Sequence, residues 1–390
     1  MSGARHFVLA AGGTGGHMIP AHALAEELIR RGHHVALITD ERGARIPGVF
    51  GGVETHVLPA GRLSGGPVGW LRAGRAILAG RRMALDLYRR IEPAAVIGFG
   101  GYPALPALLA ALKAKIPTAV HEQNAVLGRV NRLLGGRVDL IATAYPEVER
   151  LKPGWLSRTH LVGNPVRDEV LALRDQPFPA LDTEGIFRVL VIGGSQGATV
   201  LSDVVPEGLG LLPVALRRRL QVVQQCRLDD IERVRARYAE LGIPAELATY
   251  LNDMPDRLAL AHLVIARAGA STIAELTAAG RPAILVPLPI ATDDHQTANA
   301  REMAKAGGAR VMKQTRLSAA EIADNDVVPA GKERKYTAGR FTPQELSRQM
   351  QKLALEPGAL QNAAARAKDC GRPNAAADLA NLVETIGGVA

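Results

Sequence analysis

Short runs of aliphatic residues alternate along the chain with longer stretches rich in alanine, leucine and arginine. The first such runs are FVLAA, HVALITD and AAVIGFG, and a helix-like stretch, AHALAEELIRR, separates the first two. Continuous apolar runs are typical of strands that are buried on both faces of a parallel sheet. The alternation therefore predicts repeated strand–helix–strand units.

The same rhythm restarts at residues 188–198 (RVLVIGGSQGA), after a stretch that contains proline, aspartate and glycine. We therefore expect two domains, residues 1–165 and residues 166–372, each a Rossmann-like α/β domain with a doubly wound parallel sheet. The Ala/Leu-rich tail, residues 373–390, predicts a helix that returns to the first domain. The polar segment 324–343 interrupts the rhythm, and we expect it to be a loop insertion.

The composition is that of an ordinary globular protein, with 47% hydrophobic and 22% charged residues. The two cysteines, Cys226 and Cys370, lie far apart with no second pair, so the pattern predicts no zinc site and favours a reducing compartment. No run reaches the roughly 18 apolar residues that a membrane-spanning helix needs, and the N-terminus opens without a cleavable signal. We therefore expect the protein to stay in the cytosol.

Lysine and arginine number 47 against 38 aspartates and glutamates, which gives a net charge of +9. Such an excess favours nucleic acid, anionic lipid or a phosphate-rich substrate without choosing between them. Aromatic residues make up only 4% of the chain, and no nucleic-acid recognition motif occurs. We therefore expect no nucleic-acid partner.

Four glycine-rich turns follow predicted strands and precede predicted helices. Glycine tolerates positive φ and lets backbone N–H groups approach a ligand, while the next helix N-terminus adds partial positive charge. One such turn is equally explained by tight packing, but four together indicate an anionic ligand. None has the spacing of a dinucleotide fingerprint or of a P-loop. The turns are GGTGGH (12–17), GFGGYP (98–103), GGSQGA (193–198) and RAGASTIAE (267–275).

Polar side chains near the turns of the first half are candidates for chemistry. A neutral His17 can take a proton from a hydroxyl and a protonated one can pair with a phosphate, while a capping or core histidine is the alternative. In the run HEQN we expect Asn124 to be the ligand, with His121 and Glu122 structural. Arg167, in GNPVR, has a fork of donors suited to a phosphate, unless it is a solvated surface side chain.

The second half offers two further groups. Glu275 lies three residues after Thr272, so it either closes a capping box at a helix start or accepts hydrogen bonds from both ribose hydroxyls of a nucleotide. The run DDHQTANA follows a strand and presents His295, Gln296 and Asn299 as hydrogen-bonding groups suited to a sugar.

Taken in order, GGTGGH, GFGGY, HEQNA, GNPVR, GGSQGA, ASTIAEL and DxxQxxNA closely resemble the motifs of the MurG family. This family comprises the UDP-N-acetylglucosamine:N-acetylmuramyl-(pentapeptide) pyrophosphoryl-undecaprenol N-acetylglucosamine transferases of peptidoglycan synthesis. The resemblance spans nearly the whole chain. It implies a GT-B glycosyltransferase, in which two Rossmann-like domains face a cleft, with the acceptor mostly on the first domain and the UDP-sugar mostly on the second.

The resemblance further implies an inverting transfer of N-acetylglucosamine (GlcNAc) from UDP-GlcNAc to the C4 hydroxyl of undecaprenyl-diphospho-N-acetylmuramoyl-pentapeptide (lipid I), which yields lipid II. It requires no cofactor and, in principle, no metal. His17 becomes the candidate catalytic base. Leu251 becomes the uracil contact, Glu275 the ribose ligand and Gln296 a sugar ligand.

The remaining residues that the resemblance assigns fall into two sets. The donor set is Thr14, Gly15, Gly16, Asn124, Arg167, Ser195, Leu251, Ala270, Ser271, Thr272, Glu275 and Gln296. The acceptor-diphosphate set is Gly15, Gly16, His17, Gly100, Gly101 and Tyr102. Two places depart from the family pattern: QQCR (224–227) stands where many members carry a His-Gln pair, and the segment 324–343 is longer than expected.

The lipid tail of such an acceptor requires access to a bilayer, which implies a peripheral protein at the cytoplasmic face of the inner membrane. The segment 65–90 combines apolar and basic residues as a helix on anionic lipid does, while a solvated basic face is the alternative. Other wall-synthesis proteins are candidate partners. The predicted membrane patch is Trp70, Leu71, Arg72, Arg75, Ile77, Leu78, Arg81 and Arg82, together with Val68, Arg89 and Arg90.

Two other functions fit parts of the pattern. A UDP-N-acetylglucosamine 2-epimerase or a different glycosyltransferase would share the nucleotide contacts but needs no lipid site, and HEQNA and Trp70 argue against it. A non-catalytic sensor of nucleotide sugars would bind the donor tightly without turnover.

Overall fold

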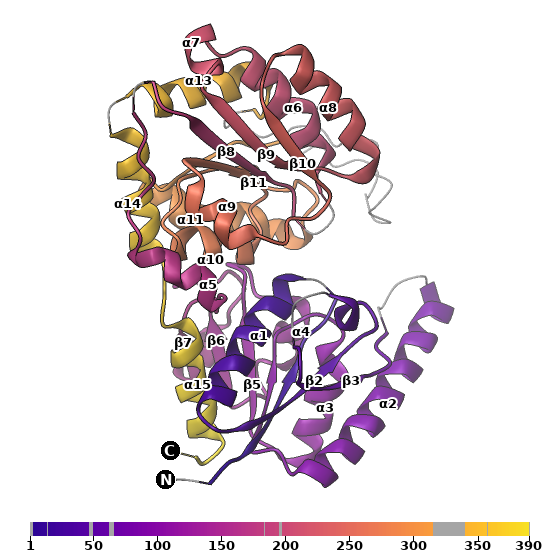
Figure 1. Cartoon of the computed structure of the whole chain (residues 1–390). Coiled ribbons are helices and arrows are strands. Elements are labelled where there is room, and N and C mark those ends of the chain that lie inside the picture. Colours follow the sequence, from indigo (N-terminus) through magenta and orange to yellow (C-terminus); the bar gives the residue numbers. More distant parts are fainter. Residues whose placement is uncertain are drawn as a thin grey trace. The chain divides into compact units, whose positions relative to one another are not determined.

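Strands and helices alternate along the chain in the computed structural model, as the hydrophobic pattern predicts (Figure 1). The structure describes residues 3–13, 15–46, 50–61, 66–182, 184–194, 197–314, 340–356 and 358–389. The strands are β1 (His6–Ala10), β2 (His34–Thr39), β3 (Glu54–Val57), β4 (Ala95–Gly98), β5 (Thr118–Glu122), β6 (Leu140–Thr143), β7 (Thr159–Leu161), β8 (Phe187–Ile192), β9 (Leu220–Gln225), β10 (Ala245–Ala248), β11 (Leu263–Ala266), β12 (Ala283–Leu285) and β13 (Ala309–Val311). The helices are α1 (Gly15–Arg30), α2 (Gly66–Ile91), α3 (Ala104–Ala114), α4 (Arg129–Leu134), α5 (Asp168–Leu171), α6 (Thr199–Gly210), α7 (Val214–Arg217), α8 (Ile231–Glu240), α9 (Met254–Leu260), α10 (Ala270–Ala278), α11 (His295–Ala306), α13 (Pro343–Leu355), α14 (Ala359–Cys370) and α15 (Ala375–Ile386).

The strands β1 to β7 form one parallel sheet in the order β3-β2-β1-β4-β5-β6-β7. Successive side chains of a strand point to opposite faces, so Phe7 and Leu9 pack under α1 and α15, while Val8 and Ala10 pack under α2 and α3. Burial on both faces explains why residues 7–10 of β1 form an unbroken apolar run. The connections diverge between β1 and β4, at the centre of the sheet.

The strands β8 to β13 form a second parallel sheet in the order β10-β9-β8-β11-β12-β13. Val189 and Val191 of β8 lie in a core that also contains residues of α6, α8 and α13. Here the connections diverge between β8 and β11. The two sheets confirm the predicted fold class, an α/β protein with two doubly wound parallel sheets.

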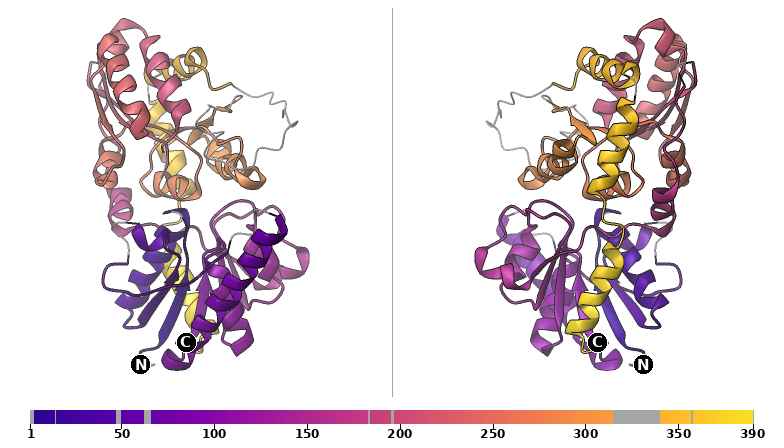
Figure 2. Two further views of the ribbon diagram at one scale, coloured as in Figure 1. Left: turned by 90° about the vertical axis from the view of Figure 1, so that its right-hand side faces the viewer. Right: turned by 90° about the vertical axis from the view of Figure 1, so that its left-hand side faces the viewer.

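The chain divides into two compact units, which we call unit 1 (Met1–Asp168 with Arg372–Ala390) and unit 2 (Glu169–Gly371). The last helix, α15, therefore belongs to unit 1. It packs along α1, and Figure 2 shows this yellow helix beside the indigo elements of the same unit.

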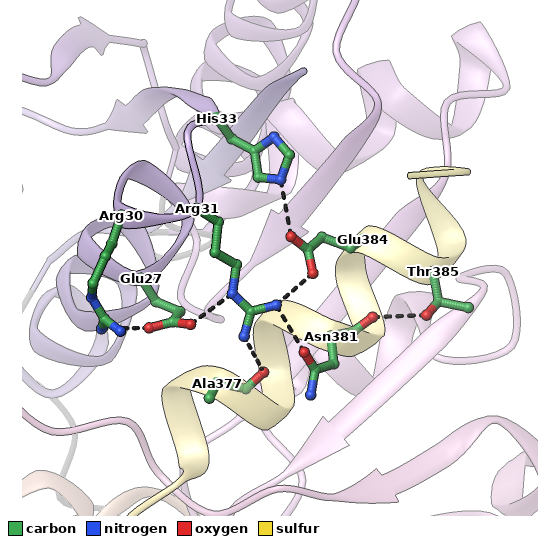
Figure 3. Close-up of polar contacts among 8 residues, drawn as sticks. All are labelled: Glu27, Arg30, Arg31, His33, Ala377, Asn381, Glu384 and Thr385. Atoms are coloured by element: carbon green, nitrogen blue, oxygen red, sulfur yellow. Dashed lines mark hydrogen bonds and ion pairs between the residues drawn. The ribbon is translucent and has the colours of Figure 1, made fainter. Parts of the chain in front are cut away.

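Charged side chains fasten α15 to the end of α1 (Figure 3). The Arg31 guanidinium donates to Glu27 Oε1 at 2.6 Å, to Asn381 Oδ1 at 2.8 Å and to the Glu384 carboxylate. The other Glu384 oxygen lies 2.9 Å from His33 Nε2. Because these groups are largely removed from solvent, their contacts are worth more than those of an exposed ion pair.

A buried arginine joins the ends of two helices in unit 2. Arg281 is 2% exposed and donates to carbonyl oxygens at the ends of α9 and α10. The last carbonyl groups of a helix lack intrahelical partners and carry partial negative charge, so they suit a cation. Burial lowers the pKa of Arg281 to about 10, which leaves it charged at pH 7. The acceptors are the oxygens of Leu258 (2.6 Å), Ala259 (3.1 Å), Ala279 (2.9 Å) and Gly280 (3.2 Å).

Candidate functional site

The four glycine-rich turns lie at the carboxyl ends of the two central strand pairs. In unit 1 they join β1 to α1 and β4 to α3, and in unit 2 they join β8 to α6 and β11 to α10. Ligands of open α/β sheets bind outside the carboxyl ends of the strands where the connections diverge. The prediction that each turn joins a strand to a helix is confirmed, and each unit holds one pair.

The first turn of unit 1 is packed tightly on its neighbours. The Asp40 carboxylate accepts hydrogen bonds from the backbone N–H groups of Gly13, at 3.0 Å, and Gly43, at 2.9 Å. A Cβ atom at Gly12 would lie 2.7 Å from Pro103 Cβ, so only glycine fits where the first and second turns meet.

Most of the predicted acceptor-diphosphate residues come together at these two turns. Residues 15 and 16 form the start of α1, where backbone N–H groups point away from the helix. The His17 ring lies against the second turn, because a Cβ atom at Gly100 would be 3.5 Å from His17 Cε1 and one at Gly101 would be 3.4 Å from His17 Cδ2. Gly100 and Gly101 have φ of 82° and 75°, which favours glycine, and Tyr102 follows them.

Gln123 links His17 to a buried histidine. His17 Nδ1 lies 2.9 Å from Gln123 Oε1, and Gln123 Nε2 lies 2.9 Å from His121 Nδ1. His121 Nε2 in turn lies 2.9 Å from the Gly163 carbonyl oxygen. Burial lowers the pKa of His121 to about 4, so this ring is neutral at pH 7.

The neighbouring carboxylate, Glu122, organises the turn after β5. It accepts hydrogen bonds from Asn124 N at 3.0 Å, Asn124 Nδ2 at 3.2 Å, Gly128 N at 2.7 Å and Asn131 Nδ2 at 2.9 Å. Because Glu122 is buried and holds these groups, it has the structural role that the sequence predicts. The ligand role of Asn124 stays a prediction.

The GNPVR segment leads from β7 to α5. A Cβ atom at Gly163 would lie 2.6 Å from Arg372 Cβ, so glycine is needed where the returning chain passes. Asn164 is buried, and neither of its side-chain polar atoms has a hydrogen-bond partner within the described residues. Arg167 is half-buried at the end of this segment.

In unit 2, the third turn packs against the run QQCR. A Cβ atom at Gly197 would lie 2.9 Å from Arg227 Cγ. Gln224 is fully buried, and its Oε1 accepts a hydrogen bond from the Tyr238 hydroxyl at 2.6 Å. This departure from the family's His-Gln pair therefore places a structural amide in the interior of unit 2.

The fourth turn leads into α10, which begins at Ala270 with Gly269 as its N-cap. Thr272 therefore lies within the first turn of the helix, and the alternative that Thr272 and Glu275 form a capping box is wrong. The N–H groups of residues 270–272 belong to the N-terminal turn, whose partial positive charge suits a phosphate. Glu275 is buried one turn further along.

Two side chains hold the loop between β12 and α11. Arg267 Nη1 donates to Val286 O at 3.2 Å, and Gln296 Oε1 accepts a hydrogen bond from Leu288 N at 3.0 Å. Gln296 therefore fixes the loop that precedes its own helix. Just before that helix, Asp293 and Asp294 have φ of 57° and 56°, a left-handed conformation that is costly outside glycine and is often found at functional sites.

Two other predicted contacts of unit 2 are largely enclosed. Leu251, the predicted uracil contact, is 7% exposed. Asn299 is fully buried, and its Nδ2 donates to Ala268 O at 3.3 Å. Asn299 therefore lies in the interior of unit 2, and the sugar-binding role predicted for it stays a prediction.

Most of the predicted membrane patch is exposed on α2. Val68, Trp70, Leu71 and Leu78 are more than half exposed, with Trp70 at 62%. Ile77 differs from the prediction, because it packs partly on the core beneath the helix. Arg81 is also only half-exposed, whereas Arg72, Arg75, Arg82, Arg89 and Arg90 are exposed.

Some predicted residues lie outside the part of the chain that the structure describes, and two other predictions concern metal ions and membrane spans. Thr14, Ser195 and residues 324–339 of the predicted insertion lie outside the described residues. Within the part of the chain that the structure describes, no cluster of three or more histidine, cysteine, aspartate or glutamate side chains has an arrangement that holds a metal ion. No helix in those same ranges is long and apolar enough to cross a membrane.

Gln123 and Asp40 contact the site but were not among the predicted functional residues. Gln123 stands inside the HEQN run, beside the residue favoured as a ligand, and nothing in a single sequence shows that it reaches His17, 106 positions away. Asp40 ends the HVALITD run, and a polar residue at the carboxyl end of a central strand is a signal that points to it.

Both halves of the chain match family models. Residues 7–143 match the glycosyltransferase family 28 N-terminal domain, and residues 188–326 match the family 28 C-terminal domain. A crystal structure of MurG from Acinetobacter baumannii matches with a TM-score of 0.72 and 27% identity, over 98% of this chain and 99% of that one.

Two relatives match over nearly their whole length. A protein of Zymomonas mobilis subsp. mobilis is 62% identical over 388 residues, which cover 100% of this chain and 94% of the relative. A protein of Novosphingobium aromaticivorans is 62% identical over 383 residues, which cover 98% and 92%. Both are named UDP-N-acetylglucosamine–N-acetylmuramyl-(pentapeptide) pyrophosphoryl-undecaprenol N-acetylglucosamine transferase.

Proposed function

Since the chain belongs to glycosyltransferase family 28, we propose that it transfers GlcNAc from UDP-GlcNAc to the C4 hydroxyl of lipid I, which gives lipid II in peptidoglycan synthesis. The observation that carries this proposal is 62% identity over the whole chain to a relative with that name. The same identity favours a transferase over the 2-epimerase and the non-catalytic sensor. Sugar transfer to a lipid-linked muramyl-pentapeptide tests it.

The proposed reaction is a direct displacement. The C4 hydroxyl oxygen attacks the anomeric carbon from the face opposite the UDP, a β bond forms, and UDP departs with the electron pair of the broken bond. The hydroxyl proton passes to a base, for which we propose His17. A positioned base of this kind contributes about 10²–10⁴-fold to the rate.

Negative charge grows on the diphosphate as it leaves. The backbone N–H groups at the start of α10 are the donors that we propose for it, because fixed donors stabilise such charge without reorganising. For Arg167, the resemblance favours a phosphate of the donor as the ligand. Unit 1 takes the acceptor diphosphate at the two turns that meet beside His17. Unit 2 takes the nucleotide, with Leu251 on the uracil, Glu275 on the ribose and Gln296 on the sugar.

Replacing Glu275 by alanine is expected to raise KM for UDP-GlcNAc by about 10- to 100-fold, because hydrogen bonds to a charged group are worth about 1.5–3 kcal/mol. Steady-state kinetics with varied donor at saturating acceptor measures this. Glu275→Gln, which keeps one acceptor oxygen, should show a smaller rise. An unchanged donor KM in Glu275→Ala would exclude the ribose role.

We also propose that the exposed apolar and basic residues of α2 bind an anionic membrane, which would place the protein at the cytoplasmic face of the inner membrane. Trp70 and Leu71 are exposed, and Arg72 and Arg75 are exposed on the same helix. An apolar face with flanking arginines gains both from burial at the lipid boundary and from attraction to anionic headgroups. A lipid-linked acceptor makes such a surface useful.

Changing Trp70 and Leu71 together to serine is expected to weaken binding to vesicles of phosphatidylglycerol and phosphatidylcholine at least about tenfold, because two apolar side chains no longer enter the lipid. Sedimentation of the protein with vesicles measures the change. Leu228→Ser is the matched control, since Leu228 is an exposed leucine of unit 2. Equal binding by the double variant and the control would assign the membrane contact elsewhere.

A further inference from the structure

We propose that Gln123 and His121 are positioning residues that hold the neutral His17 ring in the Nδ1–H tautomer, so that Nε2 carries the lone pair that accepts the hydroxyl proton. The proposal rests on the proposed function, because only the transfer reaction uses this proton acceptor. Neither residue was predicted to act on the base.

The hydrogen-bond chain is fixed at its buried end. The Gly163 carbonyl oxygen accepts and never donates, so His121 Nε2, 2.9 Å away, must carry a proton. His121 is neutral at pH 7, since burial lowers its pKa to about 4, and it therefore carries no second proton. His121 Nδ1 is consequently an acceptor.

The orientation of the Gln123 amide follows from that end. Two acceptors face it from His121, namely Nδ1 at 2.9 Å and the backbone oxygen at 3.0 Å. Only the amide NH₂ group can donate to both, so Gln123 Oε1 points the other way. The orientation of the amide therefore rests on the backbone carbonyl oxygens of Gly163 and His121, which can only accept hydrogen bonds.

The tautomer of His17 follows from the last contact of this hydrogen-bond chain. Gln123 Oε1 cannot donate, so His17 Nδ1, 2.9 Å away, donates to it and must carry the proton. In the neutral ring the lone pair then lies on Nε2. A free histidine side chain favours the opposite tautomer, so the contact selects a form that solution alone would not.

The ring also lies beside the second glycine-rich turn. Its Cε1 and Cδ2 edges lie against Gly100 and Gly101, where an added Cβ would stand 3.5 Å and 3.4 Å away. An amide partner orients the ring without adding a negative charge beside it, in contrast to the carboxylate that orients the histidine of a serine-protease triad. His17 is thus positioned as a neutral acceptor by neutral groups.

The first test is spectroscopic and needs no substrate. Two-bond ¹H–¹⁵N spectra of the full chain labelled with ¹⁵N-histidine distinguish the two neutral tautomers, and comparison with His17→Gln assigns the His17 signals among the 10 histidines. For the neutral ring of His17, we expect the Nδ1–H form. A predominant Nε2–H form in the wild type would overturn the proposal, whatever the protein's activity.

The second test uses Gln123→Met, which keeps the side-chain length and removes the amide. We expect His17 to shift toward the Nε2–H tautomer and kcat to fall on the order of tenfold, with both KM values nearly unchanged, because a smaller fraction of the enzyme carries the competent base. Gln349→Met, in α13 of unit 2, is the matched control and should alter neither. An unchanged tautomer and kcat in Gln123→Met would contradict the proposal.

Failure of the base assignment gives a different result. If His17 shows the Nδ1–H tautomer but His17→Ala retains full turnover, the contact with Gln123 exists and serves no proton transfer, which overturns the positioning role. If Gln123→Met does not fold, the wild-type spectrum still decides the tautomer.

Discussion

Replacing His17 by alanine is expected to lower kcat by about 10²–10⁴-fold while both KM values change by less than about threefold. His17 is half-buried at the turn where the acceptor diphosphate is proposed to bind, and its Nδ1 is engaged by Gln123. A base acts in the transition state more than in the bound substrate complex, so its loss affects turnover more than binding. Steady-state kinetics with both substrates varied in turn measures the two effects.

The matched control is His34→Ala, which removes an exposed histidine at the start of β2 and should leave kcat unchanged. A second possible result would give His17 a binding role in place of the catalytic one. If His17→Ala raises KM for the acceptor at unchanged kcat, the imidazole binds the acceptor diphosphate and another group takes the proton.

Replacing Arg281 by alanine is expected to lower the free energy of unfolding of unit 2 by about 4 kcal/mol. The change removes the hydrogen bonds that Arg281 donates to four carbonyl groups and removes a large side chain from the interior. Differential scanning calorimetry should show the transition of unit 2 about 10 °C lower.

Arg235→Ala is the comparison for this stability prediction. Arg235 is exposed on α8, and its contact with Glu232 is 3.7 Å long, so its loss should cost less than about 0.5 kcal/mol. If both variants shift the transition by the same small amount, Arg281 does not hold α9 and α10 together as the hydrogen bonds indicate.

The class of fold followed from the sequence because its signal is local. FVLAA (7–11) and VLVI (189–192) are apolar throughout, which a strand needs when helices cover both faces of its sheet, and each is followed by glycines that a tight turn requires. These two runs lie in β1 and β8, which are interior strands of the two sheets. The order of the strands is not local, and neither the hydrophobic pattern nor the resemblance was used to predict it.

Burial of single side chains was harder to predict than the fold. Asn299 is one of the hydrogen-bonding groups that the sequence offers for a sugar, and it is fully buried with its Nδ2 donating to Ala268 O, while Ile77 of the apolar set of α2 packs partly on the core. The helix start at Gly269 excluded the capping box that the spacing of Thr272 and Glu275 allowed. For Asn299 and Ile77, the neighbours that decide their burial lie elsewhere in the fold.

Contacts between distant residues were beyond reach of the sequence. Gln123 meets His17 because β1 and β5 belong to one sheet, and Arg281 meets the end of α9 because two helices finish side by side. Both side chains are ordinary polar residues in the sequence. Their importance comes from what the tertiary structure places around them.

The central claim is the transfer of GlcNAc to a lipid-linked muramyl-pentapeptide, and one measurement tests it most directly. The purified protein is incubated with radiolabelled UDP-GlcNAc and a short-chain analogue of the lipid acceptor, with the acceptor omitted as the control. The account predicts labelled lipid product with a β linkage, one UDP per sugar transferred, and no product without the acceptor. Binding of UDP-GlcNAc with no transfer to that acceptor would contradict it.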